Sequence, residues 1–429
     1  MVFGLEFHAF AFFWLTKGEE VILAAENRIM DCQSAAAKVW SLRRQGLGKS
    51  TVLMGGEKKG QMDNQNMAAS QHEVAAMALE EISAQVRPSD REAERLAGLR
   101  QTHLTKPPGS LGRLEEAGIK LAGAFGVERP AVRKKLIVVV AADHGVVTQG
   151  VTSYPQEVTA QMVANFLAGG AAINCMARRA GVDLEIVDAG MVGPLPDHRD
   201  LRVVSVRRCS GDITRGPAMT RGEAKACVRA GVAIALEAAE AGADLIGTGD
   251  MGIGSTTPSS AITAAVMRRS PSETTGRGTG RDDQELAHKV SCVERALEVN
   301  QPDVADGLDV LSKVGGLEIG VLAGLVLGGA FARRAVVLDG FVSGAAALIA
   351  HSLCPTVGDY IFAGHLSAEP GHRLVLSHLG LEPLLDLGMR LGEGTGAVLA
   401  MGLLEAAAQC LAEMATFAEA DVSNREPED

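Results

Sequence analysis

Aromatic residues are scarce in this chain of 429 residues: they make up 3% of the sequence, although 47% of it is hydrophobic. The core must therefore be filled by Ala, Val, Leu and other small aliphatic side chains in closely packed elements. The 50 Gly residues occur without a low-complexity tract, so many tight turns are expected. The length predicts one large domain or two to three smaller ones.

Patterned cysteines are also absent. The seven Cys residues are scattered, and no two form a C-x-x-C pair. An odd, unpatterned set in a large chain is typical of reduced thiols in a cytoplasmic protein, and it favours neither a disulfide framework nor a zinc site. We expect no bound metal and no cofactor.

Neither excess positive charge nor a long hydrophobic run is present. The formal net charge of −11 argues against nucleic-acid binding, which requires a basic surface. The longest apolar run, 319–332, contains four glycines and is shorter than the ~20 residues that span a bilayer. Residues 8–16 are apolar, but Glu6 precedes them and no basic region or cleavage site is present, so neither a membrane span nor a signal peptide is expected.

Residues 1–70 differ from the rest of the chain. They contain both Trp residues and end in a polar, turn-rich linker around residues 55–66. We expect this extension to be poorly ordered or an artefact of the assigned start, and N-terminal sequencing of protein made from the native gene would test the second explanation. The alternative start residues are Met62, Met67 and Met77.

A short segment near residue 46 is close to a phosphate-binding P-loop. It reads Gly-Leu-Gly-Lys-Ser-Thr over residues 46–51, but the pattern requires Gly at the position of Arg43, and no apolar strand leads into it. A basic turn is the stronger interpretation.

Apolar strands and Ala-rich helices alternate from about residue 130. Continuous β-branched runs are typical of strands buried on both faces of a parallel sheet, so the pattern predicts an α/β fold with a mostly parallel sheet flanked by helices. From about residue 376 the chain is expected to be helical. The expected strands are 136–142, 184–190, 201–206, 243–247 and 335–340, and the expected helices are 72–85, 89–102, 155–167, 170–180, 221–241, 258–267 and 341–352.

In parallel sheets, ligands bind at the carboxyl ends of the strands. Here the strands lead into Asp143, Asp188, Asp250 and Asp339. The segment 247–257 contains four glycines and three consecutive hydroxyl residues before a helix, which favours an anion site that includes Gly252, Gly254, Ser255 and Thr256. The alternative is a Gly-rich turn with an ordinary helix cap.

Three further regions are candidate parts of the site. Residues 276–283 form a glycine-rich loop with an acidic pair before a helix that contains Lys289, which is either a phosphate ligand or a solvated lysine. Asp143 and His144 end a strand, where hydrogen bonding is favoured over metal binding. Gln161 and Met162 suit a flat heterocycle or are plain helix positions, and residues 365–372 are either a ligand loop that includes Ser367 or a simple connection.

Glu393 is a single carboxylate among the glycines of residues 388–397. Glycines let the backbone turn sharply and let a ligand approach closely, so Glu393 is the first candidate for a general base. The residues alone leave open a solvated turn Glu before a helix.

Taken in order, the motifs from about residue 85 to 415 resemble the nicotinate-nucleotide–dimethylbenzimidazole phosphoribosyltransferase family of cobalamin lower-ligand synthesis. These motifs are Lys106–Glu115, Ala142–Val146, Tyr154–Thr159, Gly249–Thr257, Gly278–Gly280, Gly315–Ile319, Leu338–Gly340, Ser367–His372 and Leu391–Gly396.

The resemblance implies a reaction and a set of site residues. Nicotinate mononucleotide gives its phosphoribosyl group to 5,6-dimethylbenzimidazole, and nicotinate and α-ribazole 5′-phosphate form with inversion. Glu393 would be the general base, and Asp250 stands where the family often has Glu. The 5′-phosphate would bind near Gly252, Lys289, Gly340 and Ser367, and the acceptor base near Tyr154, Gln161, Met162 and Leu391.

The resemblance also implies an organisation. Family members are homodimers with a Rossmann-like large part and a small helical part from both chain ends. We expect a phosphoribosyltransferase domain over residues 71–429, with the small helical part at about 72–125 and 376–415 and the large part at about 130–375. The alternatives are an N-ribosyl hydrolase or phosphorylase, and a non-catalytic nucleotide-binding protein on the same fold.

Overall fold

The computed structural model describes residues 77–194, 197–278 and 282–424. The expectation for residues 1–70, including the P-loop-like segment, lies outside the described residues. Residues 77 onward belong to one compact unit. The division of this unit into a small helical and a large α/β part stays a prediction.

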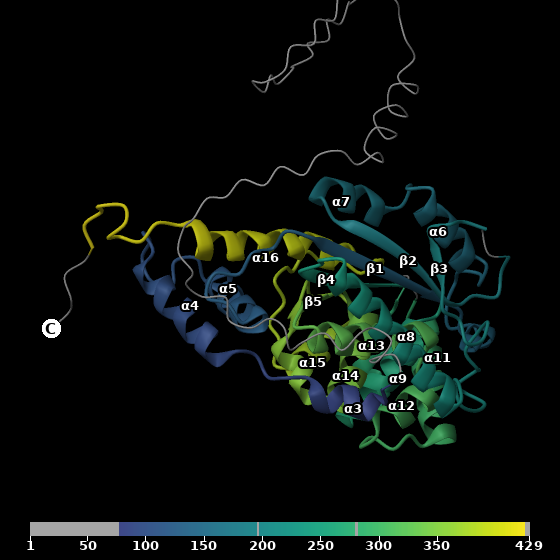
Figure 1. Ribbon diagram of the computed structural model, residues 1–429. Coiled ribbons are helices and arrows are strands. Elements are labelled where there is room, and N and C mark those ends of the chain that lie inside the picture. The colour runs from purple at the N-terminus through teal and green to yellow at the C-terminus, as the bar shows by residue number, and fades with distance from the viewer. Residues whose placement is uncertain (1–76, 195–196, 279–281, 425–429) are drawn as a thin grey trace, which may run out of the picture. The chain divides into compact units, whose positions relative to one another are not determined.

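A six-stranded parallel sheet forms the centre of the fold, in the order β3-β2-β1-β4-β5-β6 (Figure 1). This confirms the predicted α/β class. β3 is shorter than expected, and β6 was not predicted because it is only three residues long. The strands are β1 (Lys135–Ala142), β2 (Asp183–Gly190), β3 (Leu201–Val203), β4 (Leu245–Met251), β5 (Ala335–Leu338) and β6 (Ile361–Ala363).

Helices cover both faces of the sheet, because alternate strand residues point to opposite sides. In β1, Ile137 and Val139 pack with residues of α6 (Val158–Leu167), α7 (Ala172–Ala180) and α16 (Thr395–Glu413). Val138 and Val140 pack with the other large set of helices (Figure 1). That set is α8 (Arg221–Glu240), α9 (Thr256–Met267), α11 (Asp283–Asn300), α12 (Gly307–Val314), α13 (Leu317–Phe331) and α14 (Phe341–Leu353).

The two helices α8 and α13 approach closely enough that only glycine fits between them. A Cβ added at Gly324 would overlap with Val228 O, and one added at Gly231 would overlap with Val321 O. This contact explains in part how a chain with few aromatic residues builds a dense core: backbones approach one another, and small aliphatic side chains fill the remaining space.

The N-terminal helices are α3 (Leu79–Gln85), α4 (Arg91–His103) and α5 (Arg113–Phe125). Helices α4, α5 and α16 contact one another, whereas α3 contacts α13. The expected helices at 72–85 and 89–102 therefore match the described parts of α3 and α4.

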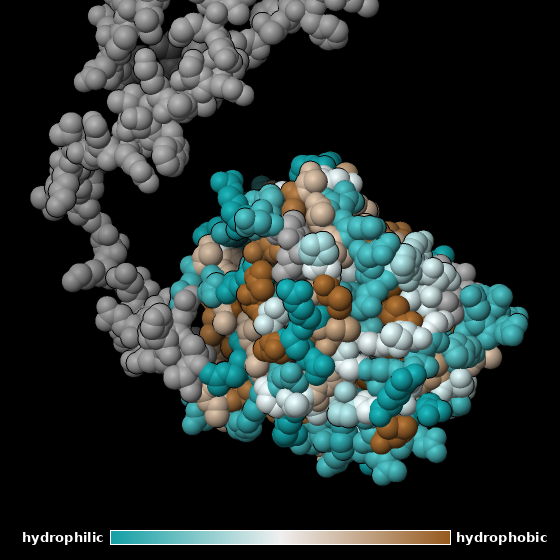
Figure 2. All heavy atoms as spheres, turned by 90° about the vertical axis from the view of Figure 1, so that its right-hand side faces the viewer, coloured by the Kyte–Doolittle hydropathy of each residue, from teal (hydrophilic) through white to brown (hydrophobic). Residues whose placement is uncertain are grey.

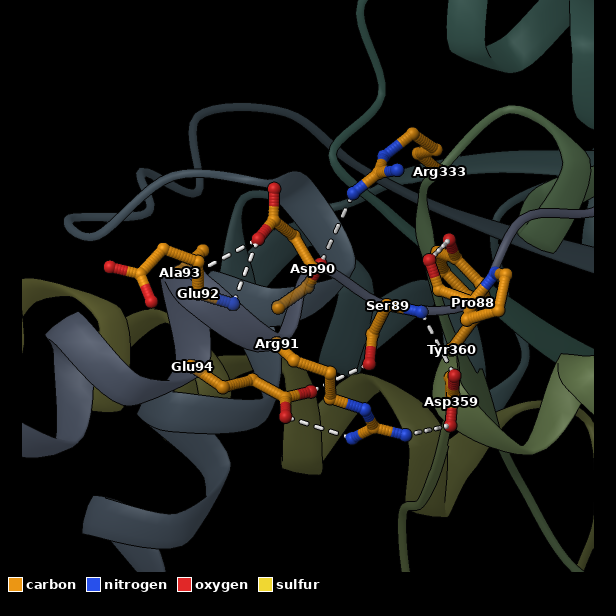
Figure 3. Close-up of polar contacts among 11 residues, drawn as sticks. Pro88, Ser89, Asp90, Arg91, Glu92, Ala93, Glu94, Arg333, Asp359 and Tyr360 are labelled. Atoms are coloured by element: carbon orange, nitrogen blue, oxygen red, sulfur yellow. Dashed lines mark hydrogen bonds and ion pairs between the residues drawn. The ribbon is translucent and has the colours of Figure 1, made fainter.

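Polar contacts fix the start of α4 (Figure 3). Asp90 Oδ1 accepts hydrogen bonds from the backbone N–H groups of Glu92 and Ala93, both at 3.0 Å. Such a cap satisfies amides that have no partner within the helix. Arg91 pairs with Asp359, which lies just before β6 in the short helix η2 (Pro355–Asp359), and so links α4 to the sheet.

The C-terminal region was only partly predicted. α15 (Pro370–His378) and α16 are helical, but residues 379–394 are not, so the expectation of a helical region from about residue 376 is wrong for this segment. Gly380, Gly388, Gly392 and Gly394 in this segment have positive φ, which a helix does not accommodate. The segment places Glu393 at the carboxyl end of β4.

α16 is long and apolar enough to cross a membrane by length and composition, with a mean hydropathy of 1.5 over its most apolar window. This is weak evidence, because 56% of that window is buried and the helix contacts β4, β5, α5 and α7. A core helix passes the same test. On the face shown in Figure 2, hydrophobic residues occur singly or in small groups on a largely hydrophilic surface.

Candidate active site

Several polar side chains meet at the carboxyl ends of adjacent strands. Asp143 follows β1, Asp250 lies near the end of β4, and Asp339 follows β5. Because β1, β4 and β5 are neighbours in the sheet, these carboxylates lie along one edge. The predicted location of the site is therefore supported by the topology.

Glu393 lies directly against the end of β4. Its backbone N–H donates to Asp250 O at 3.1 Å, and its φ of 63° is in the left-handed region. The residue is only 5% exposed, and its Oε2 is buried without a hydrogen-bond partner. The interpretation as a solvated turn Glu is therefore wrong. A strained backbone that carries a buried carboxylate oxygen without a partner is typical of a functional site.

The acidic groups at this edge hold protons more tightly than isolated carboxyls. Burial raises the pKa of Glu393, while a hydrogen bond from the Ile173 N–H at the start of α7 acts in the opposite direction. Burial and the nearby charges of Asp339, Glu318 and Glu393 raise the pKa of Asp250 well above its usual range. Clusters of this kind keep one carboxyl protonated while another acts as a base.

The contact between the Glu393 loop and β4 requires glycine at position 249. A Cβ added there would lie 2.8 Å from the carbonyl carbon of Glu393 and 2.8 Å from the Gly394 nitrogen. We predict that Gly249→Ala displaces the loop and lowers kcat on the order of 10²-fold, because catalysis is sensitive to displacements of about 1 Å. Steady-state kinetics measure the effect.

Gly402→Ala is the matched control for this substitution. A Cβ at Gly402, in the middle of α16, meets nothing within 4 Å. This variant should keep its activity and gain roughly 0.5–1 kcal/mol in free energy of unfolding. Equal activity of the two variants would show that the loop tolerates displacement.

The glycine-rich loop of the predicted anion site, residues 247–257, is shorter than predicted. Gly247 and Gly249 belong to β4, where they are needed for close packing, so the loop of the candidate site begins at Gly252. Gly252 and Gly254 are partly exposed there, and α9 begins at Thr256. The helix N-terminus and the loop amides remain suited to an anion.

The three hydroxyl residues after this loop have different environments. Ser255 Oγ lies 3.4 Å from Asp250 Oδ2, and Thr256 Oγ1 accepts a hydrogen bond from Lys289 Nζ at 2.7 Å. Thr257 is fully buried. Ser255 and Thr256 therefore connect the loop to the acidic cluster and to a cation.

Lys289 is 1% exposed, so the interpretation as a solvated lysine is wrong. Its Nζ also donates to Gly276 O at 3.2 Å, in the second glycine-rich loop. A buried ammonium group beside two glycine-rich loops is suited to hold a phosphate as a point charge. Asp282 caps α11, as the acidic pair predicted.

Gly340 and Ser367 lie side by side after β5 and β6. A Cβ at Gly340 would be 3.8 Å from Ser367 Oγ, in ordinary contact. The Ser367 N–H donates to His372 Nδ1 at 2.9 Å. The structure thus brings together Gly340 with Ser367, and Thr256 with Lys289.

The predicted base-binding residues are more exposed. Tyr154 is 50% exposed and Leu391 is 57% exposed, Gln161 is exposed, and Met162 is half-buried against the core that contains α16. Leu391 is two residues from Glu393 in sequence. The grouping of these four residues around a base stays a prediction.

Sequence reasoning missed a buried pair next to this site. His144 Nε2 lies 3.0 Å from Glu318 Oε1, and both residues are essentially unexposed. Burial is the largest single influence and lowers the pKa of His144, but the interactions with Glu318 and the charge of Asp143 together outweigh it, so the net pKa is raised. The Gly-Gly-Leu-Glu motif was the available signal, but nothing in the spacing showed that Glu318 reaches His144.

Glu369 was also missed. Its Oε1 accepts from the Gly278 N–H at 2.9 Å, and Oε2 is buried without a hydrogen-bond partner. A cavity of about 340 Å³ lies here, lined by Gly276, Gly278, Glu369, Pro370 and Arg390 among others. Within the described ranges, no group of three or more His, Cys, Asp or Glu side chains is arranged to hold a metal ion.

Known proteins resemble this chain over most of its length. Residues 86–422 match the model of a family described as phosphoribosyltransferase. A nicotinate-nucleotide–dimethylbenzimidazole phosphoribosyltransferase from Chloroflexus aurantiacus is 54% identical over 80% of this chain and 97% of its own length. A protein of the same name from Roseiflexus sp. strain RS-1 is 52% identical over 81% of this chain and 98% of its own.

A solved structure gives the same result. The crystal structure of the enzyme of that name from Thermus thermophilus is 49% identical, has a TM-score of 0.75, and covers 78% of this chain and all of its own. The chain therefore belongs to the phosphoribosyltransferase family that includes these three proteins.

Proposed function

We propose that this enzyme transfers the phosphoribosyl group of nicotinate mononucleotide to 5,6-dimethylbenzimidazole, in the lower-ligand branch of cobalamin synthesis. The observation that carries the proposal is the buried, unsatisfied carboxylate of Glu393 at the same sheet edge as a buried lysine and two glycine-rich loops. The names of relatives that are 54% and 52% identical in sequence, over nearly their whole length, support it.

In the proposed reaction, Glu393 acts as the general base. It takes the N–H proton of one benzimidazole nitrogen while the lone pair of the other nitrogen attacks C1′ of the ribose. The bond from C1′ to the pyridinium nitrogen breaks, and neutralising the pyridinium makes nicotinate a good leaving group. Proton transfer of this kind contributes about 10²–10⁴-fold, and positioning of the two substrates contributes the rest.

The donor phosphate is proposed to bind Lys289, Gly252, Gly254, Ser255 and Thr256 on one side. Gly340 and Ser367 complete the site from the next strands of the sheet. Lys289 and the amides at the start of α9 supply positive charge. Asp250, with its raised pKa, is proposed to be protonated and to donate a hydrogen bond to the ribose or the acceptor base.

Incubation with nicotinate mononucleotide and a panel of bases, followed by mass analysis, tests the function. A ribazole phosphate formed only with a benzimidazole is the expected product. Ribose 5-phosphate formed without an acceptor would indicate a hydrolase, and ribose 1,5-bisphosphate would indicate a phosphorylase. Binding without any product would indicate a nucleotide-binding protein.

We further propose a cytoplasmic homodimer, as the family resemblance implies. Exposed apolar side chains near the site support an interface, among them Tyr154, Val192, Leu387 and Leu391. Light scattering of the purified protein tests this, and a mass of one chain at micromolar concentration would exclude the dimer.

The pH dependence of kcat follows from the raised pKa values. Glu393 must be deprotonated to act as the base, and its burial raises its pKa above the usual value of a Glu side chain. We predict that kcat at saturating substrates falls as the pH is lowered through this raised pKa, by up to about tenfold per pH unit. A profile that stays flat down to pH 4.5, the ordinary pKa of Glu, would contradict this.

Buried carboxyls with raised pKa values, Asp339 among them, make the folded protein less stable as the pH rises. A carboxyl whose pKa is higher in the folded than in the unfolded state binds protons preferentially when folded. For Asp339, the stability from this preference is lost as the pH rises from about 4 through about 7. Thermal unfolding should therefore occur at lower temperature at pH 8 than at pH 5.5.

A further inference from the structure

Asp339 is a fully buried carboxylate that the proposed reaction uses neither as acid nor as base. Its two oxygens have different partners: Oδ2 accepts from the Gly394 N–H at 3.1 Å, and Oδ1 accepts from the N–H groups of Gly396 and Ala397 at 2.7 and 3.2 Å. Gly394 follows Glu393 directly and begins α16 without a side-chain cap of its own. Asp339, which follows β5, therefore caps the N-terminus of α16 and holds the backbone next to Glu393.

A row of buried side chains continues from Asp339 toward the Ser367 loop. His365 Nε2 lies 3.6 Å from Asp339 Oδ1, and the His365 ring packs against Gly396, where a Cβ would overlap with it. The His365 and His372 ring centroids are 6.2 Å apart, and His372 Nδ1 accepts from the Ser367 N–H. Burial lowers the pKa of both rings, that of His372 to about 3, so both are neutral.

We propose that Asp339 is a positioning residue for Glu393. We further propose that the row Asp339–His365–His372 fixes the position of the loop that carries Glu393 relative to the loop that carries Ser367. The row joins the end of β5, the segment after β6 and α15, and Asp339 adds the start of α16 through its hydrogen bonds. This inference rests on the proposed function of Glu393 as the base. The charged or titratable groups that face Asp339 are Glu393, Asp250 and His365.

The substitution Asp339→Asn tests the first part. An Asn oxygen can keep the bonds from Gly396 and Ala397, but its amide nitrogen then faces the Gly394 N–H, and two donors repel. The cap is kept while the contact beside Glu393 is lost. We expect kcat to fall on the order of 10²-fold, with KM for nicotinate mononucleotide within about threefold of wild type.

Asp188→Asn is the matched control. Asp188 is also a buried strand-end carboxylate, but both of its backbone bonds, from Gly190 and Met191, go to Oδ1. Asn can keep both, so this variant should retain its kcat. Equal losses in the two variants, or an unchanged kcat in Asp339→Asn, would overturn the proposal.

Hydrogen exchange separates failure of this inference from failure of the proposed function, since it needs no substrate. Amides of residues 392–395 should exchange faster in Asp339→Asn than in wild type, while those of the middle of α16 stay protected. Unchanged exchange at residues 392–395 would overturn the positioning role even if the reaction is as proposed. Faster exchange in a protein without transferase activity would leave the contact established and the reaction refuted.

His372 tests the other end of the row. His372→Ala removes the acceptor of the Ser367 N–H and should raise KM for nicotinate mononucleotide about tenfold, the usual effect of leaving a buried donor unpaired. His372→Asn places an oxygen where Nδ1 was and should restore KM. If both variants behave alike, the Ser367 contact has no positioning role.

Discussion

Glu393→Gln should lower kcat by about 10²–10⁴-fold, the usual contribution of a positioned general base, while nicotinate mononucleotide still binds. The amide has the shape of the carboxylate but cannot take a proton from the benzimidazole. Its backbone N–H can still donate to Asp250 O, so the loop should keep its conformation. Steady-state kinetics together with calorimetric titration of the donor separate the loss of chemistry from a loss of binding.

Glu382→Gln is the matched control, because Glu382 lies in the same non-helical segment, residues 379–394, but is exposed. It undergoes the same chemical change and should keep its full activity. A Glu393→Gln variant with kcat near that of wild type would refute the role of Glu393 as base. If it instead lost donor binding, Glu393 would be a binding residue for the donor.

The sequence predicts most of the fold because its signals are local. The run at 136–142 is continuous, apolar and β-branched, and β1 covers Lys135–Ala142. The helix expected at 221–241 is α8, with Thr220 as its cap. β6 was missed since three residues give no periodicity, and its strand pairing with β5 is a property of the tertiary structure.

Glycines were interpreted less well than strands. Gly247 and Gly249 looked like loop residues, since glycine weakens a strand. The structure places both inside β4, where a larger residue at Gly249 would collide with the Glu393 loop, about 145 positions away in sequence. Sequence alone does not distinguish a glycine required by a turn from one required by a distant neighbour.

The residues of the candidate site stay predictions, and the sequence did not show which of them contact one another. The sequence left open whether Lys289 is a solvated lysine or a phosphate ligand, and only the fold shows that it is buried against Thr256. The strand-end Asp339 had no evident partner, because its three hydrogen bonds reach residues more than 50 positions later. Contacts of this kind depend on which strands become neighbours.

Lys289→Met should raise KM for nicotinate mononucleotide about 10- to 100-fold, corresponding to ~1.5–3 kcal/mol for a hydrogen bond to a charged group. Met fills the space of the lysine stem but carries no charge for the phosphate. Because Glu393 and Asp250 are untouched, kcat should change much less than KM. Initial rates over a range of donor concentrations give both values.

The donor without its phosphate makes this test specific. With nicotinate riboside in place of the mononucleotide, wild type and Lys289→Met should have similar KM values, since the group that Lys289 binds is missing from the substrate. Lys225→Met, which changes a partly exposed lysine of α8, should leave both donors unaffected. If Lys289→Met weakens the two donors equally, Lys289 supports the loops through Thr256 and Gly276 and does not bind phosphate, and the anion site must then rely on the amides at the start of α9.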